Sequence, residues 1–264
     1  MDSLIKEIRE SRSLKKIDVY DGIISKDLYN KIEENLSNAK MGDLILILDK
    51  LDISFLEFGY IINTYIPNVH SVLIKDMRTT FISSNASKLE GLISKFKTNP
   101  TTYYLLLSVK AITENKLDDA HKYARCVWEK LQEYDTYFPH DVYYLAQIFY
   151  LFPFKEGLNI IDILKKQLDY WREFDNLKVT EVSFYLNAGR YIEETEGKSA
   201  HALEYYYKGL ELSKRNDFGR YTGIALLRIG SVENDQARIQ EGKTVLEIFD
   251  PDILAVMLKD IGES

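Results

Sequence analysis

A pair of helical segments that recurs at a regular interval is the feature that most restricts how this chain can fold. Aromatic-rich segments with helical periodicity begin near Thr102, Asp141, Thr180 and Arg220, at intervals of 39 or 40 residues. Each is followed by a second helical segment after a short polar break, and the breaks are Glu114–Lys116, Pro153–Lys155, Glu196–Lys198 and Glu233–Asp235. This period is typical of a helical solenoid, because one helix pair buries its apolar face only by stacking on its neighbours.

Small or aromatic residues at fixed spacing indicate that the repeated pairs are tetratricopeptide-like. The positions where the two helices of such a pair touch are matched in one unit by Ser108, Ala111, Ala120, Ala124 and Val127, and in the second helix of another by Ala202, Tyr206 and Gly209. The other two units match poorly, so we expect a divergent array. Proline after Asp250 predicts a last helix, which would cover the end of the array or meet a partner subunit through Leu254, Val256, Met257 and Ile261.

The N-terminal quarter of the chain predicts five short helices, over about residues 3–12, 16–23, 26–34, 40–51 and from 54 onward. Ser25 can cap the third helix, and Ser54 with Glu57 forms a capping box at the start of the fifth. Strict alternation of apolar and polar residues, the pattern of a strand, is nearly absent from the whole chain. We therefore expect an all-α protein, with a five-helix repressor-like helix-turn-helix domain in residues 1–66 and a tetratricopeptide-like array in residues 67–264.

Composition excludes several classes of protein. No run of eighteen apolar residues exists, so we expect no transmembrane helix and no membrane partner. Asp2 and Glu7 stand where a signal peptide needs positive charge and then an apolar stretch, so we expect a cytoplasmic location. Cys126 is the single cysteine, which excludes an internal disulfide and a cysteine-based zinc site; its helical surroundings predict an inert thiol in the core.

No constellation of residues indicates an enzyme. Two segments, Ala237–Thr244 and one that ends at Ser199, resemble a phosphate-binding loop but lack the first glycine, which lets backbone amides turn toward phosphate. The four histidines are scattered without metal-ligand spacing, and we expect the pairs Glu33–Glu34 and Glu193–Glu194 to lie on solvated helix faces. We therefore expect no catalytic activity, no cofactor and no metal.

Two segments near the N-terminus carry a resemblance to a known family. Ile24–Asn35 has serine at 25, lysines at 26 and 31, an apolar residue at 32 and glutamate at 33, and Leu44–Phe58 is an apolar helix, a turn and a capped helix. These segments resemble the recognition helix and the fourth and fifth helices of the Rgg/GadR/MutR regulators, which are peptide-sensing transcription factors of Gram-positive bacteria. The resemblance extends over about residues 3–60. It implies a homodimer that binds promoter DNA and a short signalling peptide, the latter in the concave groove of the array.

The resemblance nominates Lys26 and Lys31 as phosphate contacts, Asn30 as a base contact, and Arg9 and Arg12 as backbone contacts from the first helix. Two departures oppose DNA binding. Lysine stands at positions 26 and 31, where the family has arginine, and lysine cannot make the bidentate contact that reads guanine. Residues 1–66 hold nine Lys and Arg against twelve Asp and Glu, a net charge of −3, whereas a DNA-binding head is normally basic. Two alternatives stay open: a DNA-binding regulator, and a helical-repeat adaptor for a peptide or protein with a degenerate head.

Candidates for the peptide site lie on the first helix of each pair, which lines the concave face of such arrays. Asn187 is the only amide in an apolar and aromatic helix, and Gln147 holds a similar position one pair earlier. Such amides can satisfy the backbone of a bound peptide. Arg190 and Arg228 are candidates for a peptide carboxylate, and Tyr104 for an aromatic wall. Aromatic residues at helical spacing also fit an ordinary core, so both interpretations stay open.

Overall fold

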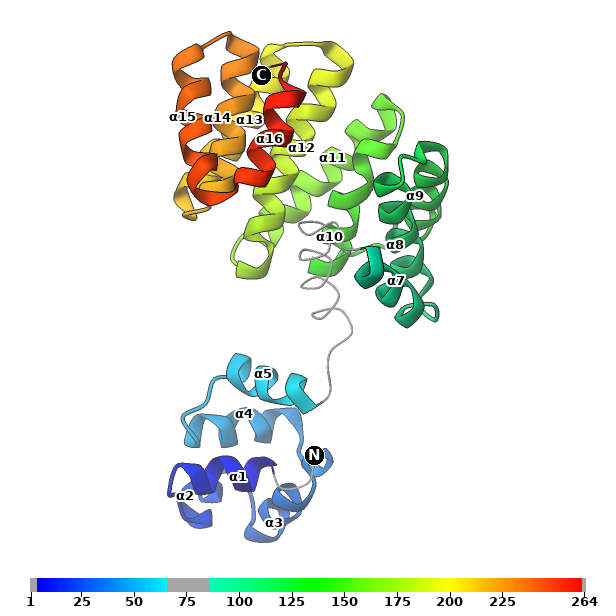
Figure 1. Cartoon of the computed structure of the whole chain (residues 1–264). Coiled ribbons are helices and arrows are strands. Elements are labelled where there is room, and N and C mark those ends of the chain that lie inside the picture. Colours follow the sequence, from blue (N-terminus) through cyan, green and yellow to red (C-terminus); the bar gives the residue numbers. More distant parts are fainter. Residues whose placement is uncertain (1–3, 66–85, 263–264) are drawn as a thin grey trace. The chain divides into compact units, whose positions relative to one another are not determined.

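The computed structural model describes residues 4–65 and 86–262, and this part of the chain is helical without any strand (Figure 1). The chain forms two compact units, Met1–Ile82 and Ser83–Ser264. The predicted all-α fold is confirmed. The boundary that we predicted between residues 66 and 67 lies outside the described residues. None of the helices in the described ranges is long and apolar enough to cross a membrane.

In its described residues, 4–65, the N-terminal unit holds five α-helices around one small core. They are α1 (Leu4–Ser11), α2 (Lys16–Tyr20), α3 (Lys26–Glu34), α4 (Met41–Lys50) and α5 (Phe55–Tyr65), with a single 3₁₀ turn at Leu36–Asn38. Tyr29 and Phe58 are the largest side chains in this core and are almost completely buried. Helices this short are marginal in isolation, so their stability depends on the shared core.

The two predicted helix caps of this unit are confirmed. The Oγ of Ser25 accepts a hydrogen bond of 3.3 Å from the backbone N–H of Leu28 at the start of α3. The backbone N–H of Ser54 donates to the Glu57 carboxylate at 2.8 Å, and the Glu57 N–H donates back to Ser54 Oγ at 3.1 Å. Between α2 and α3 the chain turns through Gly22, whose φ of 79° is readily adopted only by glycine. The result is a helix, a glycine turn and a capped second helix.

The second unit begins with α7 (Ala86–Lys95), which the sequence did not predict, and continues with four helix pairs and a last helix. The pairs are α8 (Pro100–Thr113) with α9 (Leu117–Leu131), α10 (Pro139–Ile148) with α11 (Phe154–Tyr170), α12 (Lys178–Glu196) with α13 (Ala200–Arg215), and α14 (Gly219–Glu233) with α15 (Gln236–Phe249). The first helices of these pairs start within two residues of the predicted positions. Short 3₁₀ turns follow α10 and precede α12.

The first helices of successive pairs contact one another in order, α8 with α10, α10 with α12, and α12 with α14, and so form one layer. Within a pair, glycine permits close approach of the two helices. A Cβ on Gly189 of α12 would lie 2.6 Å from the Tyr206 ring of α13, and a Cβ on Gly242 of α15 would lie 2.9 Å from the Leu227 backbone nitrogen of α14. The predicted tetratricopeptide-like packing is therefore present.

The last helix, α16 (Pro251–Asp260), packs back against the last helix pairs, where it lies in front of α12 and α14 and not beyond α15 (Figure 1, red). Its Met257 is buried against Leu227 and Leu246 of the last pair, and Leu254 and Ile261 pack on the same cluster. Val256, which we expected to share this role, is 60% exposed because it lies on the opposite side of the helix.

Candidate functional site

Three of the five predicted DNA contacts share the exposed face of α3. Lys26 and Lys31 are exposed and Asn30 is half-buried between them. The same face carries Asp27 and Glu34, both exposed. Two cations and two anions therefore surround Asn30, and this surface has no net positive charge.

Glu33 corrects the prediction that Glu33 and Glu34 both lie on a solvated face. Its residue is 3% exposed, and its carboxylate accepts a hydrogen bond of 2.7 Å from Arg9 Nε and lies 2.9 Å from Lys16 Nζ. Burial by itself raises the pKa of Glu33, but the two cations outweigh it and hold that pKa below its ordinary value. Glu33 thus joins α1, α2 and α3.

Arg9 is no longer a candidate DNA contact, because its guanidinium is buried and hydrogen-bonded within the N-terminal unit. It is 7% exposed; beyond its bond to Glu33, its Nη1 donates to the backbone oxygen of Leu14 at 2.8 Å. Arg12 stays on the surface with 44% of its side chain exposed, and it donates to the backbone oxygen of Asp52 at 3.1 Å. Arg12 therefore remains a candidate.

Lys16, which was not among the predicted contacts, lies beside Asn30. Its Nζ donates a hydrogen bond of 2.8 Å to Asn30 Oδ1 and also meets the Glu33 carboxylate. With 43% of its side chain exposed, Lys16 is on the surface that Asn30 reaches. No spacing in the sequence reveals this contact, since it depends on how α2 packs against α3.

In the array, the structure brings together the two arginines predicted to meet a carboxylate. Arg190 of α12 donates from Nη2 to Asp260 Oδ1 at 3.0 Å, and Arg228 of α14 donates to Asp260 Oδ2. Arg228 is only 7% exposed. A carboxylate does stand between these arginines, but it belongs to the chain's own last helix, α16. Sequence reasoning missed Asp260, because nothing indicates that a residue 70 positions after Arg190 returns to it.

Arg190 also donates to Glu194 at 2.8 Å, one turn along α12. Burial by itself lowers the pKa of Arg190, and the hydrogen bond to Glu194 and the charge of Asp260 outweigh it and raise that pKa. Asn187 is exposed on the same stripe of α12, one turn before Arg190. Gln147 is half-buried on α10, the first helix of the preceding pair. Three of the five predicted peptide contacts, Asn187, Arg190 and Arg228, thus belong to one face of α12 and α14.

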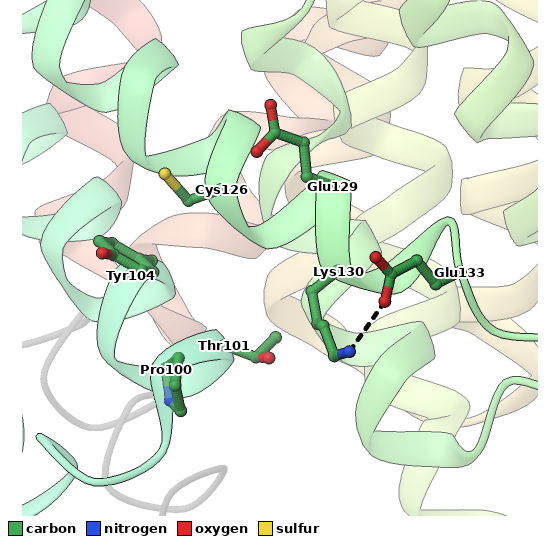
Figure 2. Close-up of a pocket in the computed structure, with 7 residues that line it drawn as sticks. All are labelled: Pro100, Thr101, Tyr104, Cys126, Glu129, Lys130 and Glu133. Carbon is green, nitrogen blue, oxygen red and sulfur yellow. Dashed lines mark hydrogen bonds and ion pairs between the residues drawn. The ribbon is translucent and has the colours of Figure 1, made fainter.

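Tyr104 belongs to a different place. Its ring stacks on Tyr123 of α9, with ring centroids 6.3 Å apart, and it lines a pocket of about 320 Å³ beside Cys126 (Figure 2). The other lining residues are Pro100, Thr101, Glu129, Lys130 and Glu133, all from the first pair or the loop after it. Tyr104 is therefore not brought to the face that Arg190 occupies.

Cys126 also departs from its predicted place in the core. It is half-buried at the edge of this pocket, whereas Ala124 and Val127 on the same helix are completely buried against α8. The packed surroundings that we inferred belong to those neighbours. In the described part of the chain, no group of three or more histidine, cysteine or acidic side chains could hold a metal ion.

Comparison with solved structures finds relatives in fold over almost the whole chain. A putative transcriptional regulator from Listeria monocytogenes EGD-e superposes with a TM-score of 0.76 at 16% identity, covering 99% of this chain and 98% of that one. PlcR from Bacillus thuringiensis, solved with the peptide PapR7 and DNA, gives 0.71 at 16% identity, covering 99% and 98%. The SHP pheromone receptor Rgg2 from Streptococcus dysgalactiae gives 0.70 at 13% identity, covering 98% and 97%.

At these identities the likeness establishes the fold. The chain has a helix-turn-helix head followed by a tetratricopeptide-like array, the architecture of these solved structures. No protein-family model matches the sequence, and no curated protein matches it.

Proposed function

We propose that this protein is a cytoplasmic, homodimeric transcription regulator, which binds promoter DNA through its head and is controlled by a short signalling peptide bound by its array. The observation that carries the proposal is the likeness over 99% of the chain to PlcR, which was solved with both a peptide and DNA. One chain here combines both parts of that architecture. Either part alone occurs in proteins of many functions, so their combination is the stronger argument.

The surface of the head supports contact with DNA through a small set of side chains. Lys26 and Lys31 on α3 and Lys16 on α2 are placed to neutralise phosphates around Asn30, which would meet a base edge. Arg12 is the remaining candidate for a backbone contact. The acidic neighbours on α3 weaken this attraction, so we propose an affinity that depends strongly on base contacts.

The face of α12 and α14 supports a site for a peptide carboxylate. Two guanidiniums that already share one carboxylate can share another, with charge-assisted hydrogen bonds of the same geometry. In the proposed complex the peptide carboxylate takes the place of Asp260, and the exposed amide of Asn187 bonds to the peptide backbone. Gln147 extends the same site along the neighbouring helix α10.

The test is fluorescence anisotropy of the full chain with labelled DNA from upstream of its own gene, against a scrambled duplex, over a series of salt concentrations. A preference for the upstream DNA that weakens steeply with salt supports the regulator. Adding short synthetic peptides should then change that affinity. Equal binding to both duplexes, with and without peptide, argues against it.

A second candidate function is that of an adaptor that does not bind DNA. It is favoured by one observation, the equal number of cations and anions on the exposed face of α3. In this case the array binds a peptide or protein and the head serves dimerisation. Capture of a partner by the array, together with no affinity for any duplex at low salt, would support the adaptor.

A further inference from the structure

The contact between Lys16 and Asn30 fixes which way the Asn30 amide faces. A lysine ammonium has three donors and no acceptor, so only the amide oxygen can turn toward it. The 2.8 Å hydrogen bond from Lys16 Nζ to Asn30 Oδ1 therefore turns the Nδ2 amino group of Asn30 away from Lys16. Asn30 is half-buried on the exposed side of α3, where that amino group can meet a base.

We propose that Lys16 makes Asn30 a donor-only base contact, which selects guanine over adenine at one position of each half-site. This inference rests on the proposed function, since it requires that α3 lies in the major groove. Lys16 is then a positioning residue for specificity, and Asn30 is the residue that reads the base.

The preference follows from the edges that the bases present. Adenine shows an acceptor, N7, beside a donor, N6–H₂, and asparagine reads this pair with its amino group and its oxygen together. Guanine shows two acceptors, N7 and O6, and needs only donors. In this chain the oxygen of Asn30 is engaged, and the nearby ammonium of Lys16 opposes the approach of a second donor such as N6–H₂.

The side chain of Lys16 is itself held in place by a buried carboxylate. Its Nζ lies 2.9 Å from the buried carboxylate of Glu33, which also accepts a 2.7 Å hydrogen bond from Arg9. Lys16 is therefore held between a buried anion and the Asn30 oxygen, and it cannot swing away without leaving Glu33 with one cation. An exposed lysine without such an anchor would not impose a single amide orientation.

The experiment is selection of bound duplexes from a random DNA library by the full-length protein, followed by sequencing, with four variants run in parallel. Asn30→Ala identifies the position that Asn30 reads, because only there is the preference lost. Lys16→Met removes the ammonium but keeps the stem of the side chain. Asn30→Asp keeps the contact with Lys16 but turns the outer group into an acceptor. Lys15 is exposed and directly precedes Lys16 in the sequence, so Lys15→Met is the matched control for loss of charge.

We expect the wild-type protein to prefer guanine over adenine at the Asn30 position by roughly 5- to 150-fold, the range for one good base contact. Lys16→Met should shift that position toward adenine, and Asn30→Asp toward cytosine, whose N4–H₂ is a donor. Lys15→Met should leave every base preference unchanged.

Three results would overturn the inference. Adenine at the Asn30 position of the wild-type motif is one, and an unchanged preference in Lys16→Met is another; both leave the regulator intact. A wild-type protein that enriches no motif contradicts the proposed function as well, so the two failures are distinguishable. Circular dichroism of each variant shows whether the fold is kept, and Asn30→Asp tests the inference even where Lys16→Met is unstable.

Discussion

Glu33 connects three helices of the head, and its removal should cost more than that of any exposed acidic neighbour. Glu33→Ala leaves the buried guanidinium of Arg9 without its carboxylate, and breaking a buried ion pair in this way destabilises a domain by about 3 to 5 kcal/mol. Both tryptophans, at 128 and 171, lie in the array, so their fluorescence does not report on the head. Hydrogen exchange of peptides from residues 4–50 should therefore show the loss of protection.

Glu34→Ala is the matched control for this variant. Glu34 is exposed on the same helix, so we expect a change within about 0.5 kcal/mol. Equal protection of the head in Glu33→Ala and Glu34→Ala would contradict the role that we give to the buried ion pairs.

The lowered pKa of Glu33 predicts that the head loses stability in acid. Because the pKa is depressed in the folded state, the stabilisation by Glu33 is fully present above its ordinary pKa of 4.5 and is lost as the pH falls below that value toward the folded pKa. Protection of the head from exchange should decline through this range, and Glu33→Gln should flatten the decline. A decline of the same steepness in both proteins would assign acid sensitivity to other groups.

At the residue scale, exposure could be predicted from helical spacing but the partners of charges could not. Lys26 and Lys31 reach the surface as expected. Glu33 and Glu34 are adjacent in sequence, yet successive residues point about 100° apart around a helix, so one is buried and the other is not. The burial of Arg9 could have been predicted, because Arg9 follows Ile5 by four positions and so lies on the apolar face of α1.

At the scale of helices, the contact between α14 and α15 depends on the absence of a side chain at Gly242. A Cβ there would lie 2.9 Å from the Leu227 backbone nitrogen and 3.0 Å from the Gly223 backbone oxygen, and backbone cannot move aside as a side chain can. We expect Gly242→Ala to destabilise the array by about 1 to 3 kcal/mol, in spite of the higher helix propensity of alanine. Urea unfolding followed by tryptophan fluorescence measures this change.

Gly91→Ala provides the opposite control in the same assay. Gly91 is exposed within α7 and has open space where a Cβ would lie, so alanine should stabilise that helix by about 0.5 to 1 kcal/mol. A stabilising effect of Gly242→Ala would show that the two helices are not held as close as the structure has them.

The helices themselves could largely be predicted, since the 39-residue period and the polar breaks are properties of the sequence. The starts of α8, α10, α12 and α14 were expected to within two residues. The return of α16 to α12 and α14 could not be foreseen, because its contacts depend on how the whole array is stacked. For the same reason the bonds of Arg190 and Arg228 to Asp260 were not foreseen, and their contact with a peptide carboxylate stays a prediction.

For the molecule as a whole, the small number of cations in the proposed DNA-contacting set limits how strongly salt affects DNA binding. With Arg9 buried, the candidates for phosphate contact are Arg12, Lys16, Lys26 and Lys31. Each phosphate neutralised contributes about −0.9 to the slope of log K against log salt, so we expect at most about −4 for each head. Lys26→Met and Lys31→Met should each reduce the steepness by about one per head.

Lys166 is an exposed lysine of α11, so Lys166→Met is the control and should leave the salt dependence unchanged. Anisotropy at several salt concentrations gives all four slopes. A slope that does not respond to either α3 variant would mean that α3 does not face the phosphates, in favour of the adaptor.

In the proposed complex, Asp260 competes with the peptide carboxylate for Arg190 and Arg228. The charge of Asp260 therefore affects how tightly a peptide binds. While Asp260 occupies Arg190 and Arg228, the binding-competent state is a fraction of the population, and the apparent affinity is reduced by that fraction. Asp260→Asn keeps the shape of the side chain and removes its charge. We expect it to tighten binding of peptides with a free C-terminal carboxylate by about 3- to 10-fold, with little effect on amidated forms.

The binders come from affinity selection out of a pool of short synthetic peptides, and their Kd values are then measured in pairs, free acid against amide. Asp252→Asn, at the exposed start of the same helix, is the control for a lost charge on α16.

Because coupling between two sites is reciprocal, a peptide that changes DNA affinity must have its own affinity changed by DNA to the same degree. Asp260→Asn should then shift DNA affinity in the direction that the peptide does. Free-acid and amidated peptides that respond equally to Asp260→Asn would place the peptide carboxylate elsewhere.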